Sequence, residues 1–474
     1  MRFGNTNKNK FFLYCRNLYY LCSLIAVFNM FKRNIEKELL HWSSDKYRKP
    51  LVLRGARQVG KTTVIKCFAE QFENFLFVNL EKSTAVRLFE STDNVVELLP
   101  QLFLYCNIKR REGKTLLFID EIQNSPHAIA LLRYFYEELP EIHVIAAGSL
   151  LETLLDKHIS LPVGRVQYMA LHPCSFTEFL GATGDERFVE LLLNATLPPA
   201  FHNELMRKFN TYSLTGGMPE VVAHYAENKD IISLSKVYNE LLNAYRNDVE
   251  KYAQNNIQAS TIRYILDEGW IFAGETITLG GFAGSPYKAR ETGEAFRTLN
   301  KAMLLELVYP VTSVVMPAAS DLKKAPKLFW LDAGIVNYVA KIQKEYLLSA
   351  DLLDTWRGKA AEQIAYQELK TLSFDVGEKR NFWVRAKRGS VAEVDFVYHF
   401  DGKIIPIEVK SGHNARLKSL HQFMEECEHN IAVRVWTGGY RIDEVKTLNQ
   451  KIFRLINLPF YMISALPQLL KKMI

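Results

Sequence analysis

The sequence predicts an α/β protein built from several domains, and three patterns indicate this fold class. A glycine-rich segment, residues 55–62, separates a short apolar run from a helix-forming run. The continuous apolar run at 115–119 ends in two acids, as expected of a buried parallel strand. Two alternating runs at 393–400 and 403–410 flank an Asp-Gly pair, which is a strong hairpin signal. At 474 residues the chain exceeds the size of one core, so we expect roughly three or four domains.

The first of these patterns is a complete phosphate-binding loop, G-x-x-x-x-G-K-T. Its glycines, Gly55 and Gly60, let backbone N–H groups close around phosphate oxygens, and the helix that follows directs its positive end toward them. Lys61 is expected to reach the β- and γ-phosphates and Thr62 to bind Mg²⁺, with Thr63 completing the set around the nucleotide. Because a strand precedes the loop and a helix follows it, the sequence predicts a domain that binds ATP and Mg²⁺.

The apolar run at 115–119 predicts where the catalytic acids lie. It ends in Asp120 and Glu121, about sixty residues beyond the phosphate loop. Asp120 would hold Mg²⁺ through water, and Glu121 would polarise the attacking water, since phosphoryl transfer depends mostly on positioning and charge neutralisation. The alternative is an ordinary strand that ends on two solvated acids. Further strands at 75–80, 143–147 and 166–171 complete the predicted open sheet.

Ser149 and Arg165 are weaker candidates. Ser149 follows the strand at 143–147, where its hydroxyl would contact the γ-phosphate or the attacking water, and it also fits a helix N-cap. Together the loop, Asp120 with Glu121, Gly148-Ser149 and Gly164-Arg165 resemble AAA-type ATPases of archaea and bacteria. This resemblance implies that Arg165 is an arginine finger for the γ-phosphate, often that of a neighbouring subunit, and hence that the chain forms a homo-oligomer. The alternative is a surface arginine.

Beyond residue 172 the pattern becomes helical. The turn at 216–220 joins two helices, and the family that the chain resembles carries a similar Gly-Gly-x-Pro-Glu in its helical lid. Residues 260–331 then show the order helix, extended piece, helix and hairpin, which is compatible with a winged helix. Its second helix mixes Tyr287, Lys288, Arg290, Arg297 and Lys301 with Glu291 and Glu294. DNA and a protein partner are therefore both open as its ligand.

The late hairpin gathers charged side chains. If Asp401-Gly402 is the turn, Asp395 lies opposite Glu408 and Glu393 lies opposite Lys410. Alternation places these four on one face and the apolar set, Val394, Phe396, Ile407 and Val409, on the other. Opposed carboxylates repel each other, and a divalent cation between Asp395 and Glu408 would remove that cost. Lys410 would then activate a metal-bound water for attack on a phosphodiester.

This spacing of acids and lysine resembles the PD-(D/E)xK restriction-endonuclease-like nucleases, although no Pro precedes Asp395. The resemblance implies that Glu362, on the helix at 360–370, is an additional metal-binding acid, and Gln422 is a weaker match. The alternative is a sheet face with a salt bridge from Glu393 to Lys410 and two solvated acids. Whether the site turns over DNA stays open, because function depends on the site and not on the fold.

From about Met30 the whole chain resembles one family, the bacterial and archaeal AAA-type ATPases with a lid, a winged helix and a nuclease-like tail. We expect an N-terminal extension over 1–29, a P-loop ATPase domain over 30–172, a helical lid over 173–255, a winged helix over 256–345 and a nuclease-like domain over 346–474. The first hypothesis is a Mg²⁺-dependent ATPase whose nucleotide state acts on DNA through the nuclease-like domain. The rival is a nucleotide-dependent switch or scaffold with an inactive tail and a protein-binding winged helix.

Charge and cysteine content bound the remaining classes. The formal net charge is +7, but residues 1–50 hold ten Lys or Arg and three acids, so the rest of the chain is neutral and only local patches would contact nucleic acid. The apolar run at 18–28 is too short to span a bilayer. We favour an extension with translation starting at Met30 over a membrane anchor. The six cysteines show no C-x-x-C spacing, so we expect a cytoplasmic protein with reduced thiols and no membrane partner.

Overall fold

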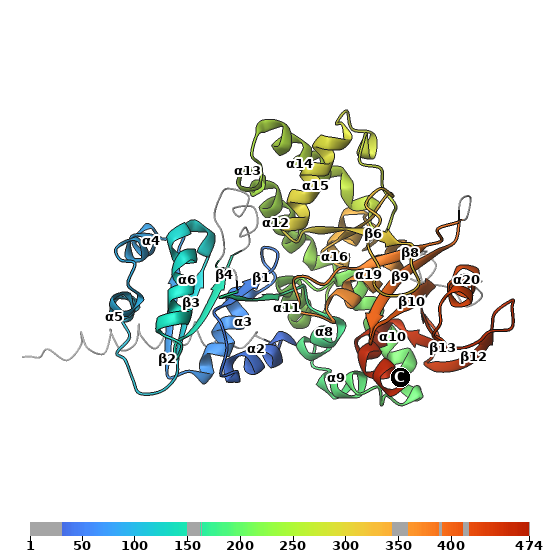
Figure 1. Cartoon of the computed structure of the whole chain (residues 1–474), viewed down its shortest axis with the longest axis horizontal. Helices are drawn as coiled ribbons and strands as arrows, with labels where there is room; N and C mark the ends of the chain where they lie inside the picture. Colours follow the sequence, from blue (N-terminus) through green and yellow to red (C-terminus); the bar gives the residue numbers. More distant parts are fainter. Residues whose placement is uncertain are drawn as a thin grey trace, which may run out of the picture.

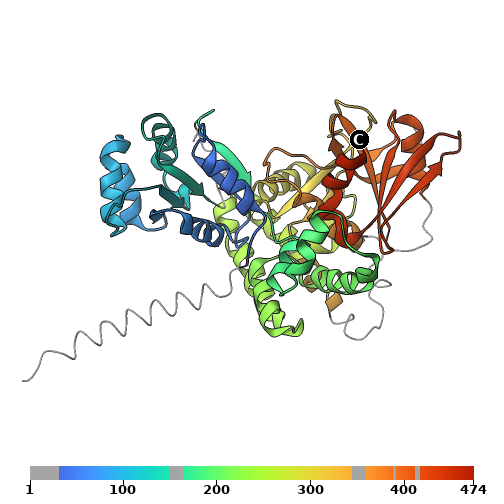
Figure 2. The same cartoon turned by 90° about the horizontal axis from the view of Figure 1, so that it is seen from below.

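The computed structural model of the chain describes residues 31–148, 162, 164–343, 359–387, 391–410 and 417–473. An N-terminal α/β unit lies at one end of the molecule and the C-terminal sheet lies at the other, with the helices of the middle segment between and around them (Figures 1 and 2). The predicted extension over 1–29, the start at Met30 and the candidate Ser149 lie outside the described residues.

The N-terminal unit is a five-stranded parallel sheet, as far as the chain is described, in the order β2-β3-β4-β1-β5. Its strands are β1 Leu51–Arg54, β2 Asn74–Asn79, β3 Thr115–Asp120, β4 His143–Ala147 and β5 Gln167–Ala170. Its helices are α2 Ile35–Ser44, α3 Lys61–Phe68, α4 Ser83–Glu90, α5 Val95–Tyr105 and α6 Pro126–Glu138. All five strands lie where the sequence predicts them.

The inner strand β3 shows why the sheet needs continuous apolar runs. All six of its residues are buried, and successive side chains enter opposite cores. Leu116 and Phe118 pack in the cluster that includes α3, whereas Leu117 and Ile119 pack in the cluster that includes α6. A strand covered by helices on both faces has no solvent-facing side, so its sequence does not alternate.

The helices of the middle segment join the two ends of the molecule. They are α8 Phe176–Ala182, α9 Glu186–Leu193, α10 His202–Thr215, α11 Pro219–Asn228, α12 Ser235–Asn247 and α13 Val249–Tyr252. A capping box of Ser175 and Glu178 begins α8. Phe176 and Phe209 share one buried cluster with Phe460 of the C-terminal region. These helices, which we call the lid because the sequence predicts one here, therefore pack on the C-terminal region.

Residues 256–343 have the predicted order of elements. Helices α14 Asn256–Glu268 and α15 Ala289–Lys301 precede the antiparallel strands β6 Leu305–Val311 and β7 Lys327–Trp330, and α16 Ala333–Val339 follows. An isolated bridge pairs Thr276 with Lys327. Strand β6 also pairs in parallel with β8, so this hairpin continues the C-terminal sheet. The winged-helix assignment itself stays a prediction.

In the described residues the C-terminal sheet has eight strands in the order β12-β13-β11-β10-β9-β8-β6-β7. Its further strands are β8 Asn381–Val384, β9 Glu393–Phe400, β10 Lys403–Lys410, β11 Ile431–Trp436, β12 Arg441–Lys446 and β13 Ile452–Pro459. Helices α19 Lys359–Lys370, α20 Lys418–Glu426 and α21 Leu466–Met473 accompany it. Helix α19 packs in the same buried hydrophobic cluster as α8 and α10, whereas α20 packs in a separate one.

The structure confirms the late hairpin and its register from Lys403 with Phe400 to Ile407 with Phe396. The predicted pairs of Asp395 with Glu408 and of Glu393 with Lys410 lie beyond this paired stretch and stay predictions. One detail of the prediction was wrong. Strand β9 carries one extra residue relative to β8, since Asn381 pairs with Val397 but Trp383 pairs with Val394. This β-bulge reverses the alternation. Val394 consequently packs in the α20 core, while Phe396 packs in the α19 core.

Candidate functional site

The phosphate loop connects β1 to α3, and its lysine side chain binds to the loop's own backbone. Gly60 has φ +90°, in the left-handed region that favours glycine, and begins α3. Lys61 Nζ donates hydrogen bonds to the carbonyl oxygens of Gly55 and Ala56, each at 2.9 Å. Burial lowers the pKa of Lys61 to about 8. The ammonium group thus lies inside the loop, where a bound anion would favour its charged form.

Thr62 and Asp120 meet at the carboxyl edge of the sheet. Thr62 Oγ1 donates to Asp120 Oδ2 at 2.7 Å, and Asp120 is the last residue of β3 with 6% of its surface exposed. Strands β1 and β3 both flank β4 in parallel, so their carboxyl ends lie at the same edge. Hydroxyl and carboxylate oxygens are ligands that Mg²⁺ prefers. These residues therefore fit a magnesium ion bound with nucleotide phosphates, as the sequence predicts.

Glu121 is held by a residue that the sequence analysis missed. Its φ of +52° is unusual for a non-glycine residue, and its carboxylate accepts a hydrogen bond from Gln123 Nε2. Burial raises the pKa of Glu121. A Cβ on Gly148 would lie 2.1 Å from Gln123 Oε1, so only glycine lets Gln123 approach this closely. Gln123 is therefore a positioning residue for the predicted catalytic acid.

A cavity of about 440 Å³ brings the predicted nucleotide residues together, a size within the range of ligand pockets. Its lining includes the predicted residues Gly60, Lys61, Thr62, Thr63, Asp120 and Glu121. Pro219 and Glu220 of the Gly-Gly-x-Pro-Glu turn also line it. This gives the lid turn a contact that the sequence alone left unassigned.

A second lid contact is made by Arg57, inside the phosphate loop. Its guanidinium group is paired with the buried carboxylate of Asp248, at the end of α12. Lys251 Nζ lies 3.0 Å from the same carboxylate. The lid is therefore attached to the loop by charge as well as by packing.

Arg165 lies away from this cavity. Its side chain is exposed and pairs with Glu137 at 3.1 Å. Because β5 is parallel to β1 and Arg165 precedes β5, it lies at the amino edge of the sheet, opposite Lys61. Within one chain the structure does not bring Arg165 to the nucleotide. Its predicted role as a finger therefore requires a second copy.

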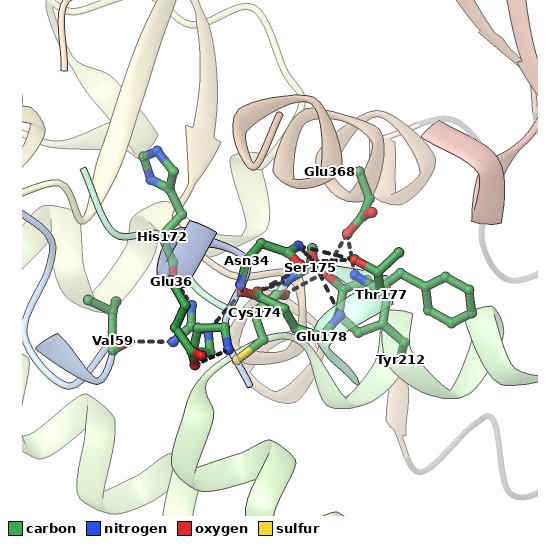
Figure 3. A network of polar contacts seen from close by, with 12 residues as sticks. Asn34, Glu36, Val59, His172, Cys174, Ser175, Thr177, Glu178, Tyr212 and Glu368 are labelled. Atoms are coloured by element: carbon green, nitrogen blue, oxygen red, sulfur yellow. Dashed lines mark hydrogen bonds and ion pairs between the residues drawn. The ribbon is translucent and has the colours of Figure 1, made fainter. Parts of the chain in front are cut away.

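A buried polar network leads from the phosphate loop into the lid (Figure 3). Arg33 donates from Nη1 to the carbonyl oxygen of Val59 at 3.0 Å, and from Nη2 to that of His172 at 2.7 Å. Its Nε donates to Glu178 Oε1 at 3.0 Å, with both side chains only 5% exposed. The carboxylate of Glu178 in turn caps α8 through the N–H of Ser175. No sequence motif marks Arg33.

The same network reaches α19 of the C-terminal domain, through Glu368 (Figure 3). Glu368 Oε1 accepts from the N–H of Phe176 at 2.9 Å and lies 2.7 Å from the hydroxyl of Tyr212. One residue earlier, Gln367 accepts from the N–H of Ala333 at 2.7 Å. Gln367 Nε2 also lies 3.5 Å from Asp332, whose carboxylate accepts from Gly217 N at 2.6 Å. Helix α19 thus contacts the start of α8 and, through Asp332, the Gly-Gly turn.

The first turn of α19 belongs to a second candidate site, the carboxylate cluster. We define it as Glu362, Glu393, Asp395 and Glu408 with the ammonium groups of Lys327 and Lys410. Lys410 Nζ lies 2.7 Å from Glu408 Oε1 and 4.0 Å from Asp395 Oδ2. Asp395 Oδ2 also accepts from the N–H of Val409 at 2.8 Å. The structure therefore brings Asp395, Glu408 and Lys410 together, as the hairpin register predicts.

Lys327 is the member of this cluster that the sequence did not indicate. Its Nζ lies 2.8 Å from Glu362, 2.7 Å from Glu393 and 3.7 Å from Asp395, and its side chain is 4% exposed. The alternative salt bridge from Glu393 to Lys410 is replaced by two others, Glu393 with Lys327 and Lys410 with Glu408. Lys327 comes from β7, seventy residues before the predicted motif, so spacing carries no sign of it.

Burial and neighbouring charges shift the pKa values of the residues in the cluster. Burial, followed by the charge of Asp395, raises the pKa of Glu362 and that of Glu408 to about 7 each. Burial alone would lower the pKa of Lys327, but Glu362, Asp395 and Glu393 raise it above its ordinary value. Glu408 Oε2 is buried and accepts no hydrogen bond. This unsatisfied oxygen is the feature of the cluster that fits an added cation.

Among the described residues, no three or more His, Cys, Asp or Glu side chains are arranged as they stand to hold a metal ion. In the cluster, ammonium groups lie among the carboxylates instead. The assignment of Asp395, Glu408 and Glu362 as metal ligands therefore stays a prediction. It requires the side chains to rearrange when a cation binds.

The cationic face predicted on α15 is mixed in the structure. Arg290 pairs with Glu294 at 3.1 Å, and Glu291 accepts from the N–H of Lys288 at 2.9 Å as a cap. Lys288, Arg290 and Arg297 are exposed. The acids offset part of the positive charge, so this face does not decide between DNA and protein.

The comparisons with known families agree with the N-terminal site. Residues 47–180 match a family described as an AAA domain. Residues 206–346 and 357–461 match two domains of unknown function, DUF8612 and DUF4143. The first match supports a P-loop ATPase core, with nucleotide binding and hydrolysis, and confirms that part of the prediction. The other two leave the winged-helix and nuclease-like assignments as predictions.

The chain is also similar to solved structures. A Walker-type ATPase of Pyrococcus abyssi is 15% identical with a TM-score of 0.41, over 66% of this chain and 96% of that one. PCH-2 of C. elegans is 12% identical with a TM-score of 0.28, over 43% and 65%. A signal transduction ATPase with a tetratricopeptide repeat sensor, from Pyrococcus horikoshii, is 12% identical with a TM-score of 0.27, over 70% and 44%. No curated protein matches the chain. The described helices include none with the length and apolar character to cross a membrane.

The nucleotide site predicts how two substitutions separate binding from turnover. Lys61→Ala removes the ammonium group inside the loop, and we expect ATP binding to fall below detection in calorimetry. Glu121→Gln keeps the loop intact but removes the base that polarises water, so we expect near-unchanged ATP affinity and at least about 100-fold slower hydrolysis. Glu97→Gln, an exposed acid on α5, is the control. Equal hydrolysis by Glu121→Gln and the unmodified protein would refute the assigned role.

The buried network predicts a pH-dependent stability. Burial raises the pKa of Glu368 from 4.5 to about 7, so the folded state favours the neutral acid. Stability is then lost as the pH rises from about 4.5 through 7, by about 3 kcal/mol when ionisation is complete. Glu368→Gln keeps the acceptor oxygen and cannot ionise. We expect its thermal midpoint to match the unmodified protein at pH 5 and to exceed it at pH 8.

Glu240→Gln is the matched control for this measurement, because Glu240 is 57% exposed on α12. It should shift the midpoint equally little at both pH values. A Glu368→Gln protein that is no more stable than the unmodified one at pH 8 contradicts the burial of a neutral acid at this position.

Proposed function

We propose that this protein is a Mg²⁺-dependent ATPase that couples its nucleotide state to the processing of DNA at the C-terminal carboxylate cluster. The observation that carries the proposal is helix α19, which bears Glu362 in the cluster and Glu368 in the network that begins at the phosphate loop. The AAA-domain match supports the ATP-dependent half. The DNA half rests on the chemistry of the cluster.

The coupling follows two routes between the nucleotide cavity and α19. One passes from Val59 through Arg33 and Glu178 to the start of α8, where Glu368 binds the N–H of Phe176. The other passes from the lid turn through Asp332, next to Gln367. Gly217 fits this second route closely, because a Cβ there would lie 2.1 Å from the carbonyl oxygen of Cys174. A movement of the loop or lid on nucleotide binding would therefore reach α19 at two neighbouring residues, Gln367 and Glu368.

The cluster supplies groups suited to phosphodiester chemistry. The Val409 N–H and the Lys410 ammonium group orient Asp395, and Lys410 also holds Glu408. A bound Mg²⁺ would polarise the phosphate and lower the pKa of water. Asp395 and Glu408 would be its first ligands, with Glu362 as the additional acid. Lys410 would hold a proton of the attacking water or steady the negative charge that develops on the phosphate.

A cationic side chain, Arg434, lies on β11, the strand beside the cluster, and Arg441 of β12 shares its aromatic partner. In the register of β10 and β11, Glu408 lies opposite Arg434, so these two side chains share a face of the sheet. The guanidinium carbon atoms of Arg434 and Arg441 lie 4.1 and 4.8 Å from the ring centre of Trp436. Arginines fixed on an aromatic ring suit the phosphates of a nucleic acid. This supports DNA as the polyanion that the cluster acts on.

The proposal includes a homo-oligomer, because Arg165 lies at the sheet edge opposite its own nucleotide cavity. Only a neighbouring copy would receive it at the γ-phosphate. Its partner within the chain, Glu137, is exposed at the end of α6, so the pair is accessible for exchange.

One observation favours the rival function, a nucleotide-dependent switch or scaffold whose tail does not cut DNA. Lys327 already supplies a positive charge among the carboxylates, so the cluster is partly neutralised without a metal. In that case the helix pair α14 and α15 would bind a protein partner, and α19 would only relay the nucleotide state.

DNA cleavage separates these two functions. We expect the unmodified protein with ATP and Mg²⁺ or Mn²⁺ to nick or linearise supercoiled plasmid. Asp395→Ala and Lys410→Ala remove a metal ligand and the lysine that holds Glu408, so each should reduce cleavage by at least about 100-fold. Gel electrophoresis of the plasmid over time measures the rates.

Lys403→Ala is the matched control, because Lys403 lies at the other end of β10 and pairs with Asp401 in the turn. It should cleave like the unmodified protein. If the unmodified protein hydrolyses ATP but neither binds nor cuts supercoiled or linear DNA, the nuclease role is rejected and the switch remains.

The coupling predicts a change in α19 that depends on the nucleotide. In the Glu121→Gln background, where ATP is bound but turned over slowly, we expect ATP to change amide hydrogen exchange in residues 359–370. Glu368→Ala removes the acceptor of the Phe176 N–H and leaves that buried donor unpaired, so the change should be lost. Exchange measured by mass spectrometry with and without ATP gives the result.

Glu368→Gln keeps the acceptor and should preserve the response, which makes it the control for the lost side chain. ATP affinity measured in parallel shows whether the nucleotide site is intact in each variant. A full response of α19 in Glu368→Ala with normal ATP affinity would exclude this route.

A further inference from the structure

We infer that Lys327 occupies one cation position of the carboxylate cluster, so that the cluster accepts no more than one divalent cation. The inference rests on the proposed function in that it treats the cluster as a metal site. It adds a residue outside the hairpin motif, and it sets the number of ions that the site takes.

Lys327 is a buried member of the cluster with several defined contacts. Its Nζ lies within 2.8 Å of oxygens of both Glu362 and Glu393, and its side chain is 4% exposed. Its backbone is paired on both sides, with Val308 of β6 and with Thr276. The ammonium group also lies 5.2 Å from the ring centre of Phe382. Moving the side chain away would remove the ammonium partner of Glu362 and Glu393.

The charges of the cluster balance with one divalent ion. A bound cation favours the deprotonated form of its carboxylate ligands. In that fully ionised state the four carboxylates and two ammonium groups leave a net charge of −2. A single Mg²⁺ or Mn²⁺ neutralises that charge, whereas two would leave an excess of +2 in a poorly solvated site. Without Lys327 the net charge would be −3, and a second divalent ion would become favourable.

Geometry indicates which side of the cluster is left for the ion. Asp395 lies between the lysines, with Oδ1 3.7 Å from Lys327 Nζ and Oδ2 4.0 Å from Lys410 Nζ. Glu408 is held by Lys410 through Oε1, while its buried Oε2 accepts no hydrogen bond. The ion therefore belongs on the Glu408 side of Asp395. On the side of Glu362 and Glu393, Lys327 takes the place of a second ion.

The test counts Mn²⁺ bound to the full chain without nucleotide. Asp120→Asn serves as the parent, because it removes the metal ligand of the nucleotide site and leaves the cluster unchanged. Electron paramagnetic resonance of free Mn²⁺ during titration gives the number bound and the affinity. We expect no more than one Mn²⁺ per parent chain. With Lys327→Met added, we expect a second ion, or at least tenfold tighter binding.

Lys323→Met, at an exposed position before the same strand, is the matched control and should leave the count unchanged. Lys327→Gln is a second neutral variant in case the methionine disturbs folding, which circular dichroism reports. Two Mn²⁺ in the parent that are lost in Asp395→Asn would overturn the inference. So would neutral Lys327 variants that fold and change neither number nor affinity. A parent that binds one Mn²⁺ yet cuts no DNA rejects the nuclease role but supports this inference.

Discussion

The contacts of the buried guanidinium group of Arg33 are the interactions on which the rest of the structure depends. It contacts the phosphate loop at Val59, the end of the parallel sheet at His172 and the lid at Glu178, all through side-chain donors in one plane. An arginine suits this position because its donors point in fixed directions, whereas a lysine would offer a single point charge. Removing either member of a buried ion pair commonly costs about 3–5 kcal/mol, because it leaves the other charge unpaired. The pair therefore fixes how the lid meets the loop.

Helix α19 extends this constraint to the C-terminal domain. Successive turns of this helix carry Glu362 with Gln363 and then Gln367 with Glu368. The first two bind β7, Gln367 binds the start of α16, and Glu368 binds the start of α8. Gln363 binds both the N–H and the carbonyl oxygen of Trp330, so the end of β7 cannot shift without the helix. Because β7 also supplies Lys327, the cluster and the network share one rigid support. Two sites on one such support respond to a movement of either.

The sequence predicted the local parts of this molecule better than the distant ones. The five strands of the N-terminal sheet and the register around Asp401-Gly402 follow from apolar runs and turn chemistry, which neighbouring residues determine. The reversal at Val394 was missed, because a β-bulge adds a residue on one strand only in relation to its partner β8. Arg33 and Lys327 were missed for a similar reason. Each acts on a group far away in the sequence, and no spacing records which buried charge a distant lysine or arginine will meet.

The two candidate sites differ in how their lysines are satisfied. Lys61 donates to carbonyl oxygens of its own loop, which carry only partial negative charge, so triphosphate oxygens compete well for it. Lys327 already lies among full negative charges, and a divalent cation must share those carboxylates with it. Lys61 can therefore exchange its carbonyl partners for phosphate oxygens, whereas Lys327 competes with any added cation for the carboxylates of the cluster. Because Lys327 and Glu362 lie on β7 and α19, a nucleotide-driven shift of these elements would change the restraint directly. Under the proposed function, ATP binding would then come first and metal-dependent chemistry second.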